Sequence, residues 1–284
     1  MYELTNIATL NRIFEECGFN LKKGLGQNFI VNPTVCPQIA QNACIDGKCV
    51  LEIGPGAGVL TCELAKRAKK VLAVEVDSKL EPILAKTLAD FDNIELFFGD
   101  IMKINLTELI KGKFGEEKFC VCANLPYYIT SPIIMLLLES GLNIESITVM
   151  VQKEAALRLC AQMGTRDCGA VTAAVRYYSE PKLLFKVGKG SFLPPPKVDS
   201  AVIRLDLKEQ SDADTVNKAN FFKVVKAAFS MRRKTLSNCL SAHLDGCDRQ
   251  KIADSLAHCE IAPSARAEQL TMEQFFALTR ALFD

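Results

Sequence analysis

The chain has 284 residues, 49% of them hydrophobic and 24% charged, with a formal net charge of +1. This composition is ordinary for a globular protein long enough for more than one domain, and the near-zero net charge says nothing about partners. No run approaches the roughly 18 apolar residues of a membrane span, and the acidic, amphipathic amino terminus is not typical of a secretory signal. We therefore expect a cytoplasmic protein without membrane association.

Twelve cysteines raise the question of disulfides or a metal centre. No C-x-x-C pair is present, and the only histidines are His243 and His258. Several cysteines lie inside predicted strands or helices: Cys49, Cys62, Cys120, Cys122 and Cys239. The pattern favours reduced core cysteines in a cytosolic protein, with no metal.

The first strong pattern is CVLEIGPGAG at residues 49–58, which predicts a buried strand, a glycine turn and a following helix. Gly54, Gly56 and Gly58 leave room for a ligand to lie against the backbone at the helix amino end. The E-x-G-x-G-x-G spacing differs from that of dinucleotide sites, and Glu52 favours a cation over a pyrophosphate. S-adenosylmethionine, with its sulfonium, ammonium and ribose, fits this turn; a tight turn without ligand is the alternative.

The next two predicted strands, 71–76 and 94–98, each carry an acid at or just after the carboxyl end. Glu75 is placed to accept hydrogen bonds from ribose hydroxyls. Asp100 follows Gly99 and is placed to accept from the adenine amino group of the cofactor, although an ordinary turn aspartate has the same appearance.

The fourth predicted strand, 119–123, runs into the residues NLPY. The Asn124 side-chain oxygen and the Leu125 carbonyl suit the exocyclic amine of a planar base. Pro126 fixes the chain direction, and Tyr127 offers a ring for stacking. A proline-terminated strand with an Asx turn is the alternative without a ligand.

A fifth strand at 147–151 completes an alternation of strands and helices, and the runs 181–187 and 200–207 suggest an antiparallel hairpin at the sheet edge. We predict an α/β fold with a Rossmann-like, seven-stranded class I methyltransferase sheet. In the intervening loop, Pro194 to Pro196 stiffen the chain and present Phe192. Phe192 either covers a target base opposite Tyr127 or is a core side chain.

After Leu207 the pattern becomes polar and then helical, which predicts a small C-terminal all-α domain. We expect helices near 219–229, 231–243, 248–257 and 264–282, with Ser264 as the cap of the last. The domain boundary is placed near residue 210, between a catalytic domain (1–210) and a helical domain (211–284).

The segment from Lys218 to Lys234 has six basic residues and no acidic ones. On a continuous helix, Lys223, Lys226, Ser230 and Arg233 would share one face, while Phe222, Val225 and Phe229 would pack inward. Such a face either meets nucleic-acid phosphates or is simply solvated.

Several motifs together resemble the bacterial small-subunit rRNA adenine dimethyltransferases. They are GLGQNFI (24–30), EIGPGAGVLT (52–61), EVD (75–77), GD (99–100), NLPY (124–127), VQKE (151–154), FLPPPKVDSAV (192–202), AFSMRRKTLSN (228–238) and RAEQLTMEQF (266–275). The related antibiotic-resistance methylases share the glycine turn and NLPY, but share less of FLPPPKVDSAV combined with the basic segment. A large-subunit resistance methylase and a non-catalytic ribosome-assembly or transcription factor remain the alternatives.

The resemblance implies S-adenosylmethionine-dependent dimethylation of two adjacent adenosines in the hairpin loop near the 3′ end of 16S rRNA, with a role in small-subunit biogenesis. It also implies a monomer that acts on the immature 30S subunit without a metal, with residues 1–30 as a helical lid. The implied cofactor residues are Asn28, Ile30, Gly54, Gly56, Glu75, Asp100 and Asn124. The implied catalytic residues are Asn124, Leu125, Pro126, Tyr127 and Phe192. The implied RNA-binding residues are Lys223, Lys226, Arg232, Arg233 and Lys234. Two departures are small: Ile30 replaces a usual leucine, and Met231 replaces a frequent glutamine.

Overall fold

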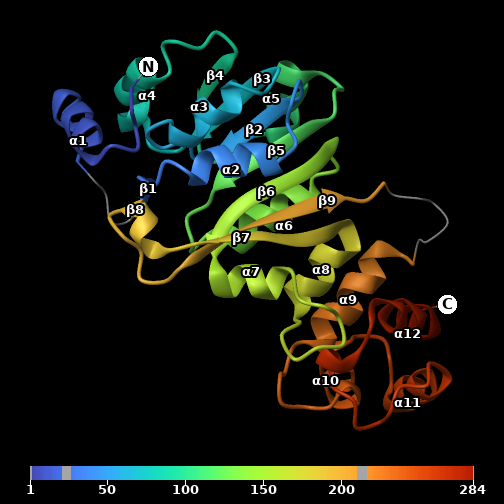
Figure 1. The fold of residues 1–284 in the computed structure, drawn as a ribbon. Coiled ribbons are helices and arrows are strands. Elements are labelled where there is room, and N and C mark those ends of the chain that lie inside the picture. Colours follow the sequence, from blue (N-terminus) through green and yellow to red (C-terminus); the bar gives the residue numbers. More distant parts are fainter. Residues whose placement is uncertain (1, 21–26, 210–215, 284) are drawn as a thin grey trace. The chain divides into compact units, whose positions relative to one another are not determined.

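The computed structural model describes residues 2–20, 27–209 and 216–283 (Figure 1). The chain divides into two compact units. The first comprises Met1–Ala156 and Pro181–Leu207, and the second comprises Leu157–Glu180 and Lys208–Asp284. Residues 157–180, which we had placed with the first domain, thus group with the C-terminal helices. The boundary expected near residue 210 lies outside the described residues.

A seven-stranded sheet has the order β4-β3-β2-β5-β6-β9-β7 (Figure 1). Its strands are β2 (Cys49–Ile53), β3 (Lys70–Glu75), β4 (Ile94–Phe98), β5 (Phe119–Asn124), β6 (Ile144–Gln152), β7 (Ser179–Val187) and β9 (Ser200–Leu207). The pairs from β4 through β6 are parallel, whereas β9 runs antiparallel to β6. The Rossmann-like methyltransferase sheet predicted from the sequence is confirmed.

Helices cover the sheet because the central strands are buried on both faces, as in β2, where all five residues are buried. In chain order they are α1 (Ile7–Glu16), α2 (Val35–Asn42), α3 (Val59–Ala65), η2 (Ser78–Leu80), α4 (Glu81–Thr87), α5 (Leu106–Phe114), α6 (Thr130–Glu139) and α7 (Lys153–Leu159). One core cluster joins α2 and α3 to the sheet, and another joins α1 and α4 to the segment around Phe29.

A two-stranded ribbon, absent from the sequence-based prediction, pairs β1 (Phe29–Ile30) with β8 (Phe192–Leu193). In this antiparallel pair Ile30 lies opposite Phe192 and Phe29 opposite Leu193. The Phe29 ring also packs against Phe14 of α1, with ring centroids 5.0 Å apart. The amino-terminal segment is thereby fixed to the loop that carries Phe192; residues 21–26 of the expected lid lie outside the described residues.

The second unit contains α8 (Ala170–Tyr178), α9 (Lys218–Ala228), α10 (Leu236–His243), α11 (Arg249–His258), η5 (Ala267–Gln269) and α12 (Met272–Phe283). Two predicted helix starts were wrong. The helix expected from 231 begins at Leu236, because the Thr235 hydroxyl caps it by accepting from the Asn238 N–H. The helix expected from 264 begins at Met272, where Thr271 and Gln274 form a reciprocal capping box, and Ser264 caps nothing there.

All twelve cysteines are free thiols, and Cys49, Cys62, Cys120, Cys122 and Cys239 are buried as predicted. Across the described residues no group of three or more His, Cys, Asp or Glu is arranged to hold a metal ion. In the same part of the chain, no helix is both long and apolar enough to cross a membrane.

Candidate active site

A cavity of about 270 Å³ opens in the first unit, where the glycine turn, the end of β3 and the NLPY segment meet the β1–β8 ribbon. The carboxyl ends of parallel strands are where open α/β sheets bind ligands. Every residue that the resemblance implied for cofactor binding or catalysis lines this one cavity: Asn28, Ile30, Gly54, Gly56, Glu75, Asp100, Asn124, Leu125, Pro126, Tyr127 and Phe192.

The glycines of the turn serve two different structural purposes. Gly54 and Gly56 line the cavity with φ of 72° and 60°, and a Cβ on Gly54 would meet no atom within 4 Å. Gly58 does not line the cavity, and a Cβ there would come within 2.9 Å of Leu88 Cδ2. Our expectation that Gly58 leaves room for the ligand was therefore wrong; it leaves room for packing.

Two acids flank the turn. Glu75 is buried, and its Oε2 and Oε1 accept the backbone N–H groups of Gly56 at 3.2 Å and Asp77 at 2.9 Å. Burial raises the pKa of the Glu75 carboxyl, and these two hydrogen bonds oppose the rise. Asp100 Oδ1 accepts from the Met102 N–H at 3.0 Å. Glu75 thus ties the glycine turn to β3 as well as facing the cavity.

Glu52 does not carry the charge that the sequence suggested. Its side chain is only 1% exposed, and its Oε2 has no hydrogen-bond partner among the described residues. Burial raises the pKa of Glu52 to about 8, and the Glu75 carboxylate adds to the rise. At neutral pH the carboxyl is therefore mostly protonated without a ligand, and the argument that it selects a cation by its negative charge does not hold.

This burial predicts a specific pH dependence of stability. Between the ordinary pKa of 4.5 and the raised value of about 8, folding must take up a proton, so the stability falls by about 1.4 kcal/mol per pH unit as pH rises. Above pH 8 the penalty is constant. Glu52→Gln removes this penalty. Urea unfolding should therefore show that the free energy of unfolding of the variant rises relative to that of the parent from pH 5.5 to 8. Parallel profiles for the two proteins would contradict this assignment.

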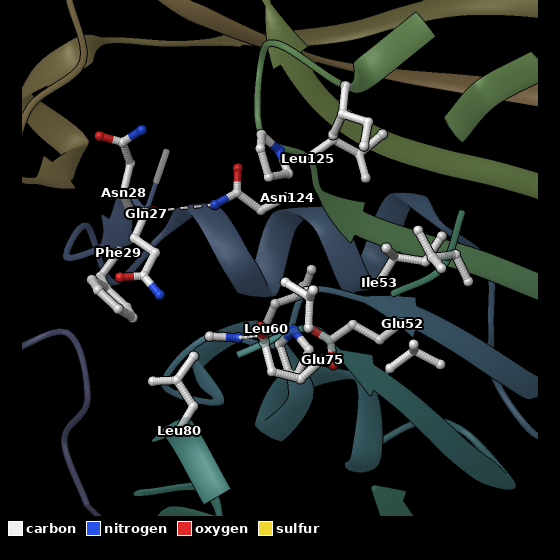
Figure 2. A pocket seen from close by; sticks show the side chains of 18 of the residues that line it. Gln27, Asn28, Phe29, Glu52, Ile53, Leu60, Glu75, Leu80, Asn124 and Leu125 are labelled. Atoms are coloured by element: carbon white, nitrogen blue, oxygen red, sulfur yellow. Dashed lines mark hydrogen bonds between the residues drawn. The ribbon is translucent and has the colours of Figure 1, made fainter. Parts of the chain in front are cut away.

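The Asn124 amide is held in one orientation. Its Nδ2 donates to the Asn28 backbone carbonyl at 3.3 Å, which leaves Oδ1 as an acceptor (Figure 2). The Pro126 carbonyl accepts from the Ile129 N–H and the Thr130 hydroxyl, whereas within the described chain the Leu125 carbonyl has no donor. Two acceptor oxygens, one from a side chain and one from the backbone, are thus available in neighbouring residues.

Two aromatic side chains complete the lining. The Tyr127 hydroxyl lies 2.6 Å from the Ser200 hydroxyl at the start of β9, which fixes the tyrosine ring. Phe192 is 4% exposed, belongs to a core cluster and also lines the cavity. The core position is confirmed, and the role of covering a target base stays a prediction. Sequence reasoning missed Ser200 and Phe29, because no local pattern links residues so far apart in the chain.

The basic segment is not one helix. Helix α9 ends at Ala228, with Lys223 and Lys226 exposed, while Arg232, Arg233 and Lys234 are exposed in the connection to α10. The prediction that Ser230 and Arg233 continue the helical face was wrong. The predicted inward positions are confirmed: Val225 is buried in the core of this unit, and Phe222 and Phe229 are half-buried and pack against it. The fully buried positions of the helix are Phe221, Val224, Val225, Ala227 and Ala228.

Solved structures with the same fold include the 23S rRNA methyltransferase ErmE, with 28% identity, a TM-score of 0.70, and coverage of 90% of this chain and all of that one. A dimethyladenosine transferase from Plasmodium falciparum has 28% identity and a TM-score of 0.74, with 88% and 95% coverage. The strand order, the glycine turn and these likenesses define a Rossmann-like methyltransferase that modifies RNA.

The model of the ribosomal RNA adenine dimethylase family matches residues 18–283, and the chain belongs to this family. Similar proteins include the ribosomal RNA small subunit methyltransferase A of Alkaliphilus oremlandii, 43% identical over 283 residues with 99% of each chain covered. The protein of the same description from Enterococcus faecalis is 43% identical over 290 residues, with 99% of this chain and 98% of that one covered.

Proposed function

We propose that this enzyme transfers methyl groups from S-adenosylmethionine to N6 of two adjacent adenosines in the hairpin loop near the 3′ end of 16S rRNA. We further propose that it acts as a cytoplasmic monomer on the immature 30S subunit and contributes to small-subunit biogenesis. The observation that carries the proposal is the pair of open acceptors, Asn124 Oδ1 and the Leu125 carbonyl, beside a glycine turn. The family and the names of the small-subunit relatives support the substrate.

The lining fits S-adenosylmethionine. A Cβ at Gly54 would extend into the cavity without touching protein, so the backbone there is open to a ligand. Glu75 and Asp100 supply carboxylate acceptors for hydroxyl and amino groups, and Asn28 and Ile30 line the same cavity from the amino-terminal segment. When bound, this cofactor supplies an electrophilic methyl group on a positively charged sulfur.

The chain's own residues would prepare the base. Adenine N6 is a poor nucleophile because its lone pair is shared with the ring. Acceptance of both amine hydrogens by Asn124 and Leu125 favours a pyramidal nitrogen and frees the lone pair, and this is electrostatic preorganisation. Tyr127 and Phe192 would hold the base from opposite faces, so that alignment contributes up to roughly 7–11 kcal/mol. The methylated nitrogen is a strong acid that loses its proton to solvent, so no general base is required.

The target nucleotide must leave its stack to reach the cavity. Bases in a hairpin loop are already partly unstacked, so extrusion costs only a few kcal/mol. A loop substrate therefore suits a cavity lined by two aromatic side chains and two acceptors.

We assign RNA binding in the second unit to Lys223, Lys226, Arg232, Arg233 and Lys234, all of which are exposed. Changing Arg232, Arg233 and Lys234 together to glutamate should weaken binding to 30S particles and flatten its salt dependence, because fewer counterions are released. Filter binding at several salt concentrations measures both effects. A charge-matched control changes three other exposed basic residues of this unit to glutamate: Arg249, Lys251 and Arg280. Equal salt slopes for the two triple variants would refute the assignment.

Mass spectrometry of 16S and 23S rRNA from a deletion strain tests the function as a whole. We expect the two dimethyladenosines to disappear from 16S rRNA and to return with the plasmid-borne gene. Loss of a 23S modification would instead favour a large-subunit methylase like ErmE. Unchanged RNA with defective subunit assembly would favour a non-catalytic assembly factor.

A further inference from the structure

Asp199 links segments of the first unit that together carry three lysines. Its Oδ1 accepts the backbone N–H of Lys189 at 3.0 Å, and its backbone carbonyl accepts the N–H of Lys153 at 3.0 Å. Lys197 lies two residues earlier in the same loop. Residues from η3 (Lys189–Ser191), from the start of α7 and from the loop before β9 are thereby gathered at one place in the first unit.

This place adjoins the side of the cavity assigned to the target base. Ser200 follows Asp199 directly, and its hydroxyl contacts the Tyr127 hydroxyl at 2.6 Å. Phe192 follows Lys189 by three residues and lines the cavity. The three lysines are therefore attached close to residues that line the cavity or contact its lining, beside which the rest of a bound nucleic acid would have to lie.

The three lysines also differ from several other lysines of the first unit in their ion pairing. Lys189 and Lys197 are exposed and Lys153 is half-buried, and within the described part of the chain no carboxylate lies within ion-pair distance of them. Lysines near the other end of the parallel strands, where the strands begin, pair with glutamates there. They are Lys48, Lys66, Lys69, Lys70, Lys111 and Lys113. Asp199 and Glu154, the exposed residue after Lys153, are nearby acids and reduce the local positive charge, so that one net positive charge remains in this group to attract an anion.

An exposed aromatic side chain lies at the same mouth. Tyr128 is 65% exposed although it lines the cavity, and it follows the half-buried Tyr127 directly. Exposed rings combined with unpaired cations are the usual means of holding single-stranded nucleic acid, because every base has a face for stacking and every linkage has a phosphate.

We infer that Tyr128, Lys153, Lys189 and Lys197 form a binding rim for the single-stranded nucleotides on either side of the target adenosine. Tyr128 stacks on a neighbouring base, and the three lysines neutralise flanking phosphates. The inference rests on the proposed function, and it places a second RNA-binding surface in the first unit, separate in sequence from the basic segment of the second unit.

Binding of a fluorescent, unstructured 12-nucleotide RNA tests the lysines in the absence of methyl transfer. Changing Lys153, Lys189 and Lys197 to glutamine should weaken binding about tenfold or more and reduce the salt slope by about 2, since each phosphate contact contributes about 0.7. The matched control changes Lys66, Lys69 and Lys111 to glutamine; these are 43%, 57% and 75% exposed and paired at the far edge of the sheet. An equal salt slope in both variants would overturn the inference.

Tyr128 should have a different signature in the same assay. Tyr128→Ala should weaken binding about fivefold or more without changing the salt slope, and Tyr128→Phe should bind like the parent, because the ring alone stacks. Calorimetry with S-adenosylhomocysteine should give parental affinity for every rim variant. The inference would be overturned if a rim variant lost affinity for S-adenosylhomocysteine, or if Tyr128→Ala bound RNA like the parent. Since no methylation is scored, a failure of the proposed 16S target would leave these results interpretable.

Discussion

Replacement of Asn124 by alanine is expected to lower kcat about 100-fold or more, measured at saturating S-adenosylmethionine so that a loss of cofactor affinity does not enter the rate. The amide presents Oδ1 to the substrate amine while its Nδ2 is held by the Asn28 carbonyl at 3.3 Å. Removal of one preorganised hydrogen-bonding group from a site of this kind costs about 10²–10³ in rate. Single-turnover transfer of labelled methyl groups to 30S particles measures the effect on chemistry directly.

Asn143→Ala is the matched control for this variant. Asn143 Nδ2 also donates to a backbone carbonyl, that of Glu116 at 3.0 Å, but it lies just before β6, at the opposite edge of the sheet from the cavity. This variant should keep the parental rate. Asn124→Asp retains an acceptor but loses the donor to Asn28, so its rate should fall between those of the alanine variant and the parent. Parental transfer by Asn124→Ala would refute the proposed role of the amide.

Gly54→Ala is expected to abolish measurable binding of S-adenosylhomocysteine while leaving the protein folded. At φ 72° an alanine costs about 1–2 kcal/mol in stability, but the added methyl group meets no protein atom within 4 Å. The methyl group would therefore occupy the space in which the cofactor lies against the backbone. Calorimetry measures the affinity, and thermal unfolding measures the stability.

Gly47→Ala is the control that separates the effect of backbone strain from the effect of blocking the cofactor site. Gly47 has φ 71°, its added Cβ would also meet nothing within 4 Å, and it lies in an exposed turn before β2, away from the cavity. The two variants should lose similar stability, and only Gly54→Ala should lose binding. Equal cofactor affinities in the two variants would show that the cavity at Gly54 is not the cofactor site.

Parts of the site were predictable because they follow strands. The glycine turn after β2, Glu75 in β3 and the NLPY segment after β5 each stand at the carboxyl end of a parallel strand, so a correct strand pattern places them at one edge of the sheet. The contact between Asn124 and Asn28 was not predictable in this way, because Asn28 precedes the sheet and reaches it through the β1–β8 ribbon.

Helix boundaries failed where a capping signal competed with hydrophobic periodicity. The basic segment has helical spacing from Phe221 onward, yet the helix ends at Ala228 and a new one begins after Thr235. The sequence T-M-E-Q at 271–274 contained a capping-box signal that periodicity over 264–282 concealed.

The sequence by itself determined the alternating α/β fold, the glycine turn and the acceptor segment, since these depend on residues adjacent in the chain and on the fixed direction of parallel strands. The tertiary structure alone decided the protonation of Glu52, the ribbon that joins Ile30 to Phe192, and the gathering of Lys153, Lys189 and Lys197 around Asp199. The reason is physical: burial, desolvation and contacts between distant segments arise only after the chain has packed.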